Sequence, residues 1–184
     1  MLKTVFVTTQ IVAILSTALY AVPVDAKDNS FAVIDSVVAE SRIDAGQLQC
    51  MGEALYWEAR NQNEKGMAGV AHVIMNRVES KYFPDTVCGV VHQGPRNGGP
   101  IKLNLCQFSY FCDGKSDVYP LNSNLDEVLA AETADLIAEN VMYNNMVDTT
   151  GGSDHYHAKY VAPSWNKVYP LRKTIGTHLF YAAY

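Results

Sequence analysis

The sequence of 184 residues predicts an α+β domain, mainly helical with a small β-sheet late in the chain. Two observations lead to this class. Apolar residues recur at helical spacing in three separate segments, whereas residues 175–184 alternate between apolar and polar, as in a strand. The composition, 48% hydrophobic and 18% charged, is typical of globular proteins, and the length suits one domain.

The first 26 residues have the features of a secretory signal peptide. Lys3 gives a positive start, residues 5–21 are mainly apolar, and Val24-Asp25-Ala26 offers a cleavage site before Lys27. An uncleaved membrane anchor is the alternative, but this apolar stretch is short for a bilayer span and contains polar residues. We therefore expect a secreted or periplasmic protein, with no stable membrane insertion after cleavage.

The first predicted helix begins at Asp44 and ends near Arg60. Asp44 and Gln47 have the spacing of a capping box, and apolar residues follow at helical spacing up to Ala59. Residues 27–43 mix charge with short apolar pieces, so we expect a linker or a peripheral segment there. The folded domain is accordingly predicted to span residues 44–184.

A second helix is predicted where Met67, Val70, Ala71, Ile74 and Val78 form an apolar stripe. His72 and Asn76 lie off that stripe, where a surface or secondary packing role is expected. Residues 87–91 fit either a short helix or a strand. A third helix is predicted to begin near Ser123, with Asp126 as a capping variant and these apolar positions: Leu125, Val128, Leu129, Leu136, Ile137 and Val141.

Residues 93–115 form a long connection rich in glycine, proline and aromatic residues. Connections of this length are usually either functional or disordered. The aromatic residues and a possible disulfide favour an ordered, functional loop.

Charge and cysteine content narrow the possible functions. The net charge of −5 argues against a nucleic-acid partner, because no basic stripe is available to neutralise phosphates. The four cysteines Cys50, Cys88, Cys106 and Cys112 follow the signal segment, so disulfides are expected. Three pairings are possible, although Cys106 and Cys112 are near enough to close a small loop. A zinc site is the competing interpretation, but no C-x2-C pair occurs.

Glu58 is the most informative residue, because its carboxyl group lies among Tyr56, Trp57 and aliphatic residues near a helix end. Burial disfavours the charged form, so such a carboxyl can stay protonated near neutral pH and act as a general acid. The alternative is a solvated carboxylate, or an ion pair with Arg60.

Glu58 could serve glycosidic bond cleavage, which needs a proton donor together with groups that stack on and hydrogen-bond to sugars. Residues of these types are Tyr56, Trp57, Gln107, Phe108, Ser109 and Tyr156. A two-carboxylate mechanism lacks a clear second acid, since Asp113 and Asp154 are more typical of turns.

A zinc site is the second candidate, formed by His155, His157 and His178. An H-x-H pair on a strand places both imidazoles on one face, but no H-E-x-x-H motif accompanies it. Cysteine-histidine catalysis is disfavoured because the cysteines are expected to be paired.

Several sequence blocks follow one another in a fixed order: residues 54–60, 64–78, 83–91, 106–109, 112–114, 150–152, 156–158, 163–165 and 175–181. Together they resemble the SleB/CwlJ cell-wall hydrolase family over about residues 48–181. The resemblance implies a lysozyme-like fold and assigns the catalytic acid to Glu58. It further implies a lytic transglycosylase that cleaves peptidoglycan glycan strands between N-acetylmuramic acid and N-acetylglucosamine, without a second carboxylate, metal or other cofactor.

The blocks also suggest which residues contact the sugars: Tyr56, Gln107, Phe108, Ser109, Tyr156 and His157. A hydrolytic muramidase is the alternative, and a zinc-dependent amidase or peptidase a more distant one. The chain departs from the family at Asn61, where glycine is common; asparagine tolerates the left-handed backbone that glycine would favour there. The cysteines suit family members from envelopes with a periplasm.

Overall fold

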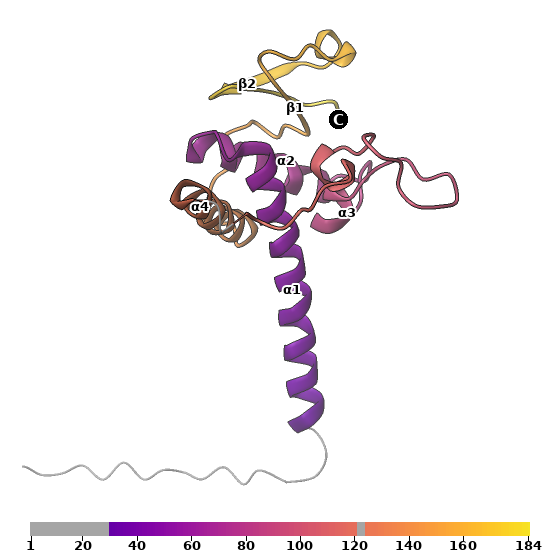
Figure 1. Cartoon of the computed structure of the whole chain (residues 1–184), viewed down its shortest axis with the longest axis vertical. Coiled ribbons are helices and arrows are strands. Elements are labelled where there is room, and N and C mark those ends of the chain that lie inside the picture. Colours follow the sequence, from indigo (N-terminus) through magenta and orange to yellow (C-terminus); the bar gives the residue numbers. More distant parts are fainter. Residues whose placement is uncertain (1–29, 121–123) are drawn as a thin grey trace, which may run out of the picture.

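The computed structural model describes residues 30–120 and 124–184, with side chains from residue 45 onward (Figure 1). The elements follow in this order: α1 (Ser30–Ala59), α2 (Glu64–Val78), α3 (Val87–Val91), the 3₁₀ helix η1 (Ser109–Cys112), α4 (Leu125–Met142), β1 (His155–Ala158), the 3₁₀ helix η2 (Ser164–Lys167), β2 (Leu171–Ile175) and β3 (His178–Tyr181). The predicted α+β class is confirmed. The predicted signal peptide lies outside the described residues.

α1 is longer than the sequence predicts. It begins at Ser30, so Asp44 lies inside the helix and is not its N-terminal cap, and much of the predicted linker is helical. The C-terminal end agrees with the prediction, since α1 ends at Ala59. Asn61 does not adopt a left-handed backbone: Asn104 and Asn144 are the non-glycine residues with positive φ in the described ranges. Within the same ranges, no helix has the length and apolar character needed to cross a membrane.

α2 and α3 follow the predicted pattern, with α3 a helix and not a strand. The Asn63 side chain caps α2 by accepting a hydrogen bond from the Gly66 N–H. His72 is buried, and the Asn76 amide donates to the backbone oxygen of Ser153 at 2.9 Å. Both residues therefore have the secondary packing role expected for that face.

α4 differs from its prediction in both its cap and its buried face. Its N-cap is Asn124, whose side chain accepts from the Glu127 N–H, in place of the predicted Ser123 start. Leu125, Leu129 and Leu136 are exposed, whereas the buried residues are Ala131, Ala134, Ile137, Ala138 and Val141. Small side chains allow α4 to pack closely against α1, so alanines and not leucines occupy this interface.

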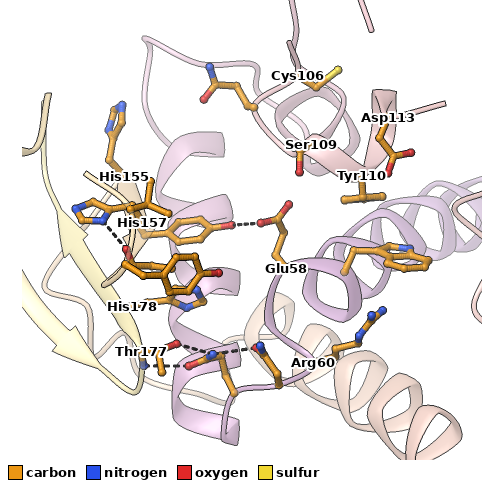
Figure 2. Close-up of a pocket in the computed structure, with 18 of the residues that line it drawn as sticks. Glu58, Arg60, Cys106, Ser109, Tyr110, Asp113, His155, His157, Thr177 and His178 are labelled. Carbon is orange, nitrogen blue, oxygen red and sulfur yellow. Dashed lines mark hydrogen bonds between the residues drawn. The ribbon is translucent and has the colours of Figure 1, made fainter. Parts of the chain in front are cut away.

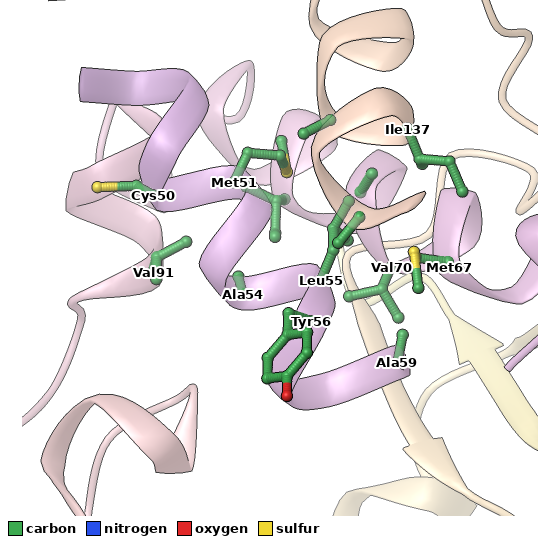
Figure 3. Close-up of a cluster of buried hydrophobic side chains, with 14 of the residues drawn as sticks. Cys50, Met51, Ala54, Leu55, Tyr56, Ala59, Met67, Val70, Val91 and Ile137 are labelled. Atoms are coloured by element: carbon green, nitrogen blue, oxygen red, sulfur yellow. The ribbon is translucent and has the colours of Figure 1, made fainter. Parts of the chain in front are cut away.

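The three helices α1, α2 and α4 enclose the hydrophobic core, with α3 on the other side of α1 (Figures 1 and 3). Figure 3 shows Met51, Leu55 and Tyr56 of α1 pointing into this cluster with Met67 and Val70 of α2. All five are at most 2% exposed, so the C-terminal half of α1 is fixed on several sides. Glu58 therefore stands on a rigid helix.

The sheet is antiparallel, with strand order β1-β3-β2, and lies across one end of the helical layer (Figure 1). β3 lies within the predicted C-terminal strand, whereas β2 was not predicted from the sequence. The sheet contacts α2 where Phe180 packs over Gly69. A Cβ atom at Gly69 would lie 2.7 Å from the Phe180 ring, so the close approach requires glycine.

Two disulfides are present, which confirms the disulfide prediction over the zinc site. Cys50 in α1 bonds Cys88 in α3, and Cys106 bonds Cys112 across the loop that contains η1. The second bond ties back residues 106–112, which form one wall of the site described next.

Candidate active site

A cleft of about 940 Å³ opens between the C-terminal end of α1, the disulfide-closed loop and the edge of β1 (Figure 2). Its lining includes both charged and aromatic side chains: Trp57, Glu58, Arg60, Asn61, Gln62, Arg77, Gln107, Ser109, Tyr110, Asp113, Asp117, His155, Tyr156, His157, Trp165, Thr177 and His178. The segments that meet here are far apart in the sequence.

Glu58 lies at the centre of this cleft, one residue before the end of α1 (Figure 2). Its Oε2 accepts a hydrogen bond from the Tyr156 hydroxyl at 3.2 Å. Burial raises the pKa of Glu58 above its usual value, while the Tyr156 hydroxyl and the backbone N–H of Ser109 oppose this rise by stabilising the carboxylate. Glu58 thus has the partial burial expected of a general acid and two donors that can hold its ionised form.

Arg77 of α2 lines the cleft together with Tyr156 and is only 4% exposed. Its Nε donates to the Asp154 backbone oxygen at 2.6 Å, and its guanidinium lies 5.1 Å from the Phe83 ring centroid. The positive charge of Arg77 opposes the rise in the pKa of Tyr156 that burial causes. Because a lower pKa makes a hydroxyl a stronger donor, Arg77 strengthens the hydrogen bond from Tyr156 to Glu58.

The loop wall contains two of the predicted sugar-contacting residues, Gln107 and Ser109. Both are exposed and line the cleft. The Gln107 N–H donates to the Gln93 backbone oxygen at 2.9 Å, and Ser109 begins η1. The loop is therefore ordered, and it presents polar side chains to the space in front of Glu58.

Tyr56 and Phe108 do not line the cleft, so the structure corrects both predictions. Tyr56 is fully buried, and its hydroxyl bonds to the Glu127 carboxylate of α4. Phe108 is 1% exposed and lies under the Arg77 guanidinium. Their sequence neighbours face the cleft, but the opposite faces of α1 and of the loop bury these aromatic rings in the core.

His157 lines the cleft but has no free ring nitrogen. Because a carbonyl can only accept, His157 Nδ1 donates to the Ala158 oxygen at 2.9 Å, and Nε2 then accepts from the Tyr181 hydroxyl at 3.1 Å. The ring edge and not a polar atom is what this histidine offers to a ligand.

The three histidines do not converge as the zinc alternative requires. His155 and His157 share one face of β1, whereas His178 lies opposite Ala158 in the register and so projects from the other face with Tyr156. His155 Nδ1 also bonds the Asp154 carboxylate at 2.8 Å. Among the described residues, no group of three metal-binding side chains is present.

Other carboxylates near the cleft have separate roles. Asp113 pairs with Lys115 at 3.4 Å, and Asp154 accepts hydrogen bonds from His155 and from the Ala183 and Tyr184 backbone. Burial and the neighbouring Asp113 raise the pKa of Asp117. No carboxylate in the described part of the chain contributes to the shift in the pKa of Glu58.

Several cleft residues were not singled out from the sequence. Gln62 Nε2 donates to the Thr177 hydroxyl at 2.7 Å and thereby joins the α1–α2 turn to the β2–β3 turn (Figure 2). Arg60, considered from the sequence only as an ion-pair partner of Glu58, instead lies 5.0 Å from the ring centroids of both Tyr56 and Trp57. Thr177 and Trp165 belong to the sequence blocks quoted above, and that membership was the available signal for them.

A cleft with one raised-pKa carboxyl among aromatic and amide side chains is typical of enzymes that cleave glycosidic bonds. The chain belongs to the cell wall hydrolase family, whose family model matches residues 61–181. The match begins three positions after Glu58, so the assignment of the acid depends on the geometry and not on this match.

Curated relatives and solved structures agree with this family. The chain is 29% identical over 157 residues to a spore cortex-lytic enzyme from Halalkalibacterium halodurans, which covers 85% of this chain and 41% of the relative. It is 33% identical over 134 residues to a spore cortex-lytic enzyme from Oceanobacillus iheyensis, which covers 72% of this chain and 40% of the relative. The chain thus spans about two fifths of the length of these relatives.

The solved structures are catalytic domains. The catalytic domain of the germination-specific lytic transglycosylase SleB from Bacillus anthracis matches with a TM-score of 0.55 and 33% identity, over 73% of this chain and 93% of that chain. The SleB catalytic domain from Bacillus cereus matches with a TM-score of 0.51 and 31% identity, over 74% and 90%. Their folds confirm the expected α+β class.

Proposed function

We propose that this protein cleaves peptidoglycan glycan strands between N-acetylmuramic acid and N-acetylglucosamine, as a lytic transglycosylase in which Glu58 is the catalytic acid and base. The observation that carries the proposal is Glu58 itself, a half-buried carboxyl with a raised pKa in the centre of an open cleft. The similarity to the SleB catalytic domain, a lytic transglycosylase by its title, supports it.

The proposed reaction uses one carboxyl twice. Protonated Glu58 donates its proton to the glycosidic oxygen while the bond from that oxygen to C1 of the muramyl sugar breaks. The Glu58 carboxylate then removes the proton from the muramyl 6-hydroxyl. The oxygen of that hydroxyl bonds to C1 and closes an anhydro ring. Glu58 ends protonated, as it began, and no water is consumed.

Tyr156 and the Ser109 N–H support the intermediate stage of this cycle. Both stabilise the carboxylate form of Glu58, which exists only between the two proton transfers. Gln107 and Ser109 lie exposed on the loop wall, where their side chains can hydrogen-bond to the sugars. His157 contributes a ring edge to the cleft from β1.

Hydrolysis by water is the second candidate. Asp113 and Asp117 line the same cleft, so a carboxylate is available there to orient a water molecule. The pairing of Asp113 with Lys115 and the similarity to a lytic transglycosylase favour the single-carboxylate reaction.

We further propose a secreted or periplasmic location, after removal of residues 1–26. The two disulfides and the activity of relatives on a spore cortex, named in their descriptions, support an oxidising, cell-envelope environment. Intact-mass measurement of the exported protein checks this, since retention of residues 1–26 would contradict the signal peptide.

Release of soluble fragments from purified sacculi tests the activity. Glu58→Gln keeps the side-chain size but cannot donate the proton, so the rate should fall at least about a hundredfold. Glu53→Gln is the matched control, because Glu53 lies on the same helix, outside the cleft, and bonds to Gln49. An unchanged rate in Glu58→Gln would remove the proposal.

A further inference from the structure

A row of aromatic rings leads out of the cleft. It begins with Trp165 and His155 on the cleft wall, whose ring centroids are 5.3 Å apart. His155 lies 6.1 Å from Phe83, Phe83 lies 6.0 Å from Tyr184, and Tyr184 stacks on Tyr82 at 4.2 Å. The row therefore connects the wall beside Glu58 to a surface that the cleft does not include.

The outer end of the row is exposed. Tyr82 is 56% and Tyr184 66% exposed, so the stacked pair still leaves apolar ring surface open to solvent. Exposed apolar surface of this kind, continuous with a cleft, marks ligand-binding grooves.

Asp154 holds two members of the row, His155 and Tyr184, in place. This carboxylate is 4% exposed and accepts from His155 Nδ1 at 2.8 Å, the Ala183 N–H at 2.7 Å and the Tyr184 N–H at 3.2 Å. The same buried group thus orients a cleft-lining ring and fixes the backbone of Tyr184. A ring that is already ordered loses less conformational entropy when a ligand binds.

We propose that Trp165, His155, Phe83, Tyr184 and Tyr82 form a track that binds sugar units of the glycan strand beyond the bond that is cut. The proposal rests on the function proposed above and adds a preference for long strands. Sugar rings have apolar C–H faces that pack on aromatic rings, and the track adjoins the cleft where the same polymer would already be held.

The test compares long peptide-free glycan strands with a short fragment of the same repeat. The double variant Tyr82→Ala/Tyr184→Ala should lower kcat/KM on long strands at least about fivefold more than on the short fragment, because two aromatic rings no longer pack against the sugars. Tyr143→Ala is the control, since Tyr143 is also 58% exposed but lies at the end of α4 and has no ring contact with the track residues. Its ratio of long-strand to short-fragment rates should equal that of the wild type.

Thermal melting separates loss of binding from loss of folding, and both tyrosines are exposed enough to be replaced without disturbing the core. Equal rate ratios in the wild type and the folded double variant would overturn the track while leaving the proposed function intact. A wild-type protein that cleaves neither substrate would overturn both.

Discussion

Glu58 combines a helix-end position, partial burial and two hydrogen-bond donors, and this combination sets its titration. Because its pKa lies above the usual value of 4.5, the folded protein binds more protons than the unfolded chain between that value and the raised pKa. Stability should therefore fall as pH rises through this window. Activity that needs the protonated acid should be lost over the same window.

Glu58→Gln removes this titration. We expect the variant to gain melting temperature relative to the wild type as pH rises from about 4 to about 8, with little difference at the acid end. Melting curves of both proteins across this range provide the measurement. A constant difference at all pH values would show that Glu58 titrates normally.

Tyr156→Phe removes the hydroxyl that donates to Glu58. The carboxylate then loses stabilisation, so the pKa of Glu58 should rise further and the alkaline limb of the pH–rate profile should move to higher pH. The rate should fall about tenfold or more, because hydrogen bonds to charged groups contribute about 1.5–3 kcal/mol.

Tyr119→Phe is the matched control for this change. Its hydroxyl also donates to a carboxylate, that of Asp135 at 3.0 Å, but Tyr119 does not line the cleft. A similar displacement of the pH profile in both variants would contradict the role of Tyr156.

Residue identity alone could predict Glu58 but not its neighbours. An acidic residue among aromatic ones is informative because most carboxyl groups are exposed to solvent and few lie in apolar surroundings. Tyr56 and Phe108 look equally suited to core and cleft, and only the direction of the side chain separates the two. That direction depends on packing against α4 and Arg77, which local sequence does not encode.

Among the elements, the disulfide-closed loop is the one that delivers groups to Glu58. Replacing Cys106 and Cys112 with serine should cost about 2 kcal/mol of stability and lower kcat/KM, because Ser109 and Gln107 lose their fixed positions. Replacing Cys50 and Cys88 frees a longer loop, with a separation of 38 residues, and should cost about 4 kcal/mol.

The two disulfide variants should thus rank in opposite order by stability and by activity. Kinetics at a temperature where both remain folded, together with denaturant unfolding, provide the comparison. Equal activity in the two variants would show that the loop needs no covalent closure.

The contact between α2 and β3 gives a second prediction at this scale. Gly69→Ala should destabilise the protein by about 1–3 kcal/mol, because the new methyl group would overlap the Phe180 ring. Gly46→Ala in α1 meets no atom within 4 Å and should instead stabilise it by about 0.5–1 kcal/mol through helix propensity. Chemical denaturation measures both, and equal effects would refute this packing account.

Hydrophobic periodicity predicted the presence of the helices and strands better than the residues at which they begin and end. α2 and the C-terminal end of α1 follow from an apolar stripe, and β3 from alternation. β2 escaped prediction because its residues are mostly exposed, so it lacks a buried face to produce a pattern. The buried face of α4 was predicted wrongly because its leucines suggest a core face. These leucines are exposed, and alanines make the contact with α1.

For the whole molecule, the cleft is assembled from α1, the loop at residues 106–117 and the late sheet. No local pattern predicts that these segments meet. The ordered blocks along the chain did indicate it, because they include Glu58, Gln107, Ser109, Tyr156 and Thr177 together. The hydrogen bonds that join these segments, such as Gln62 to Thr177 and Arg77 to Asp154, could not be predicted from the sequence and are known only from the structure.

The central claim is that one carboxyl completes the reaction without water. Mass spectrometry of fragments released from purified peptidoglycan tests this most directly, with Glu58→Gln as the inactive comparison. The single-carboxylate account predicts muramyl ends in the anhydro form, one water lighter than hydrolysed ends, and almost none from Glu58→Gln. Fragments with reducing muramyl ends, or anhydro fragments released equally by Glu58→Gln, would contradict it.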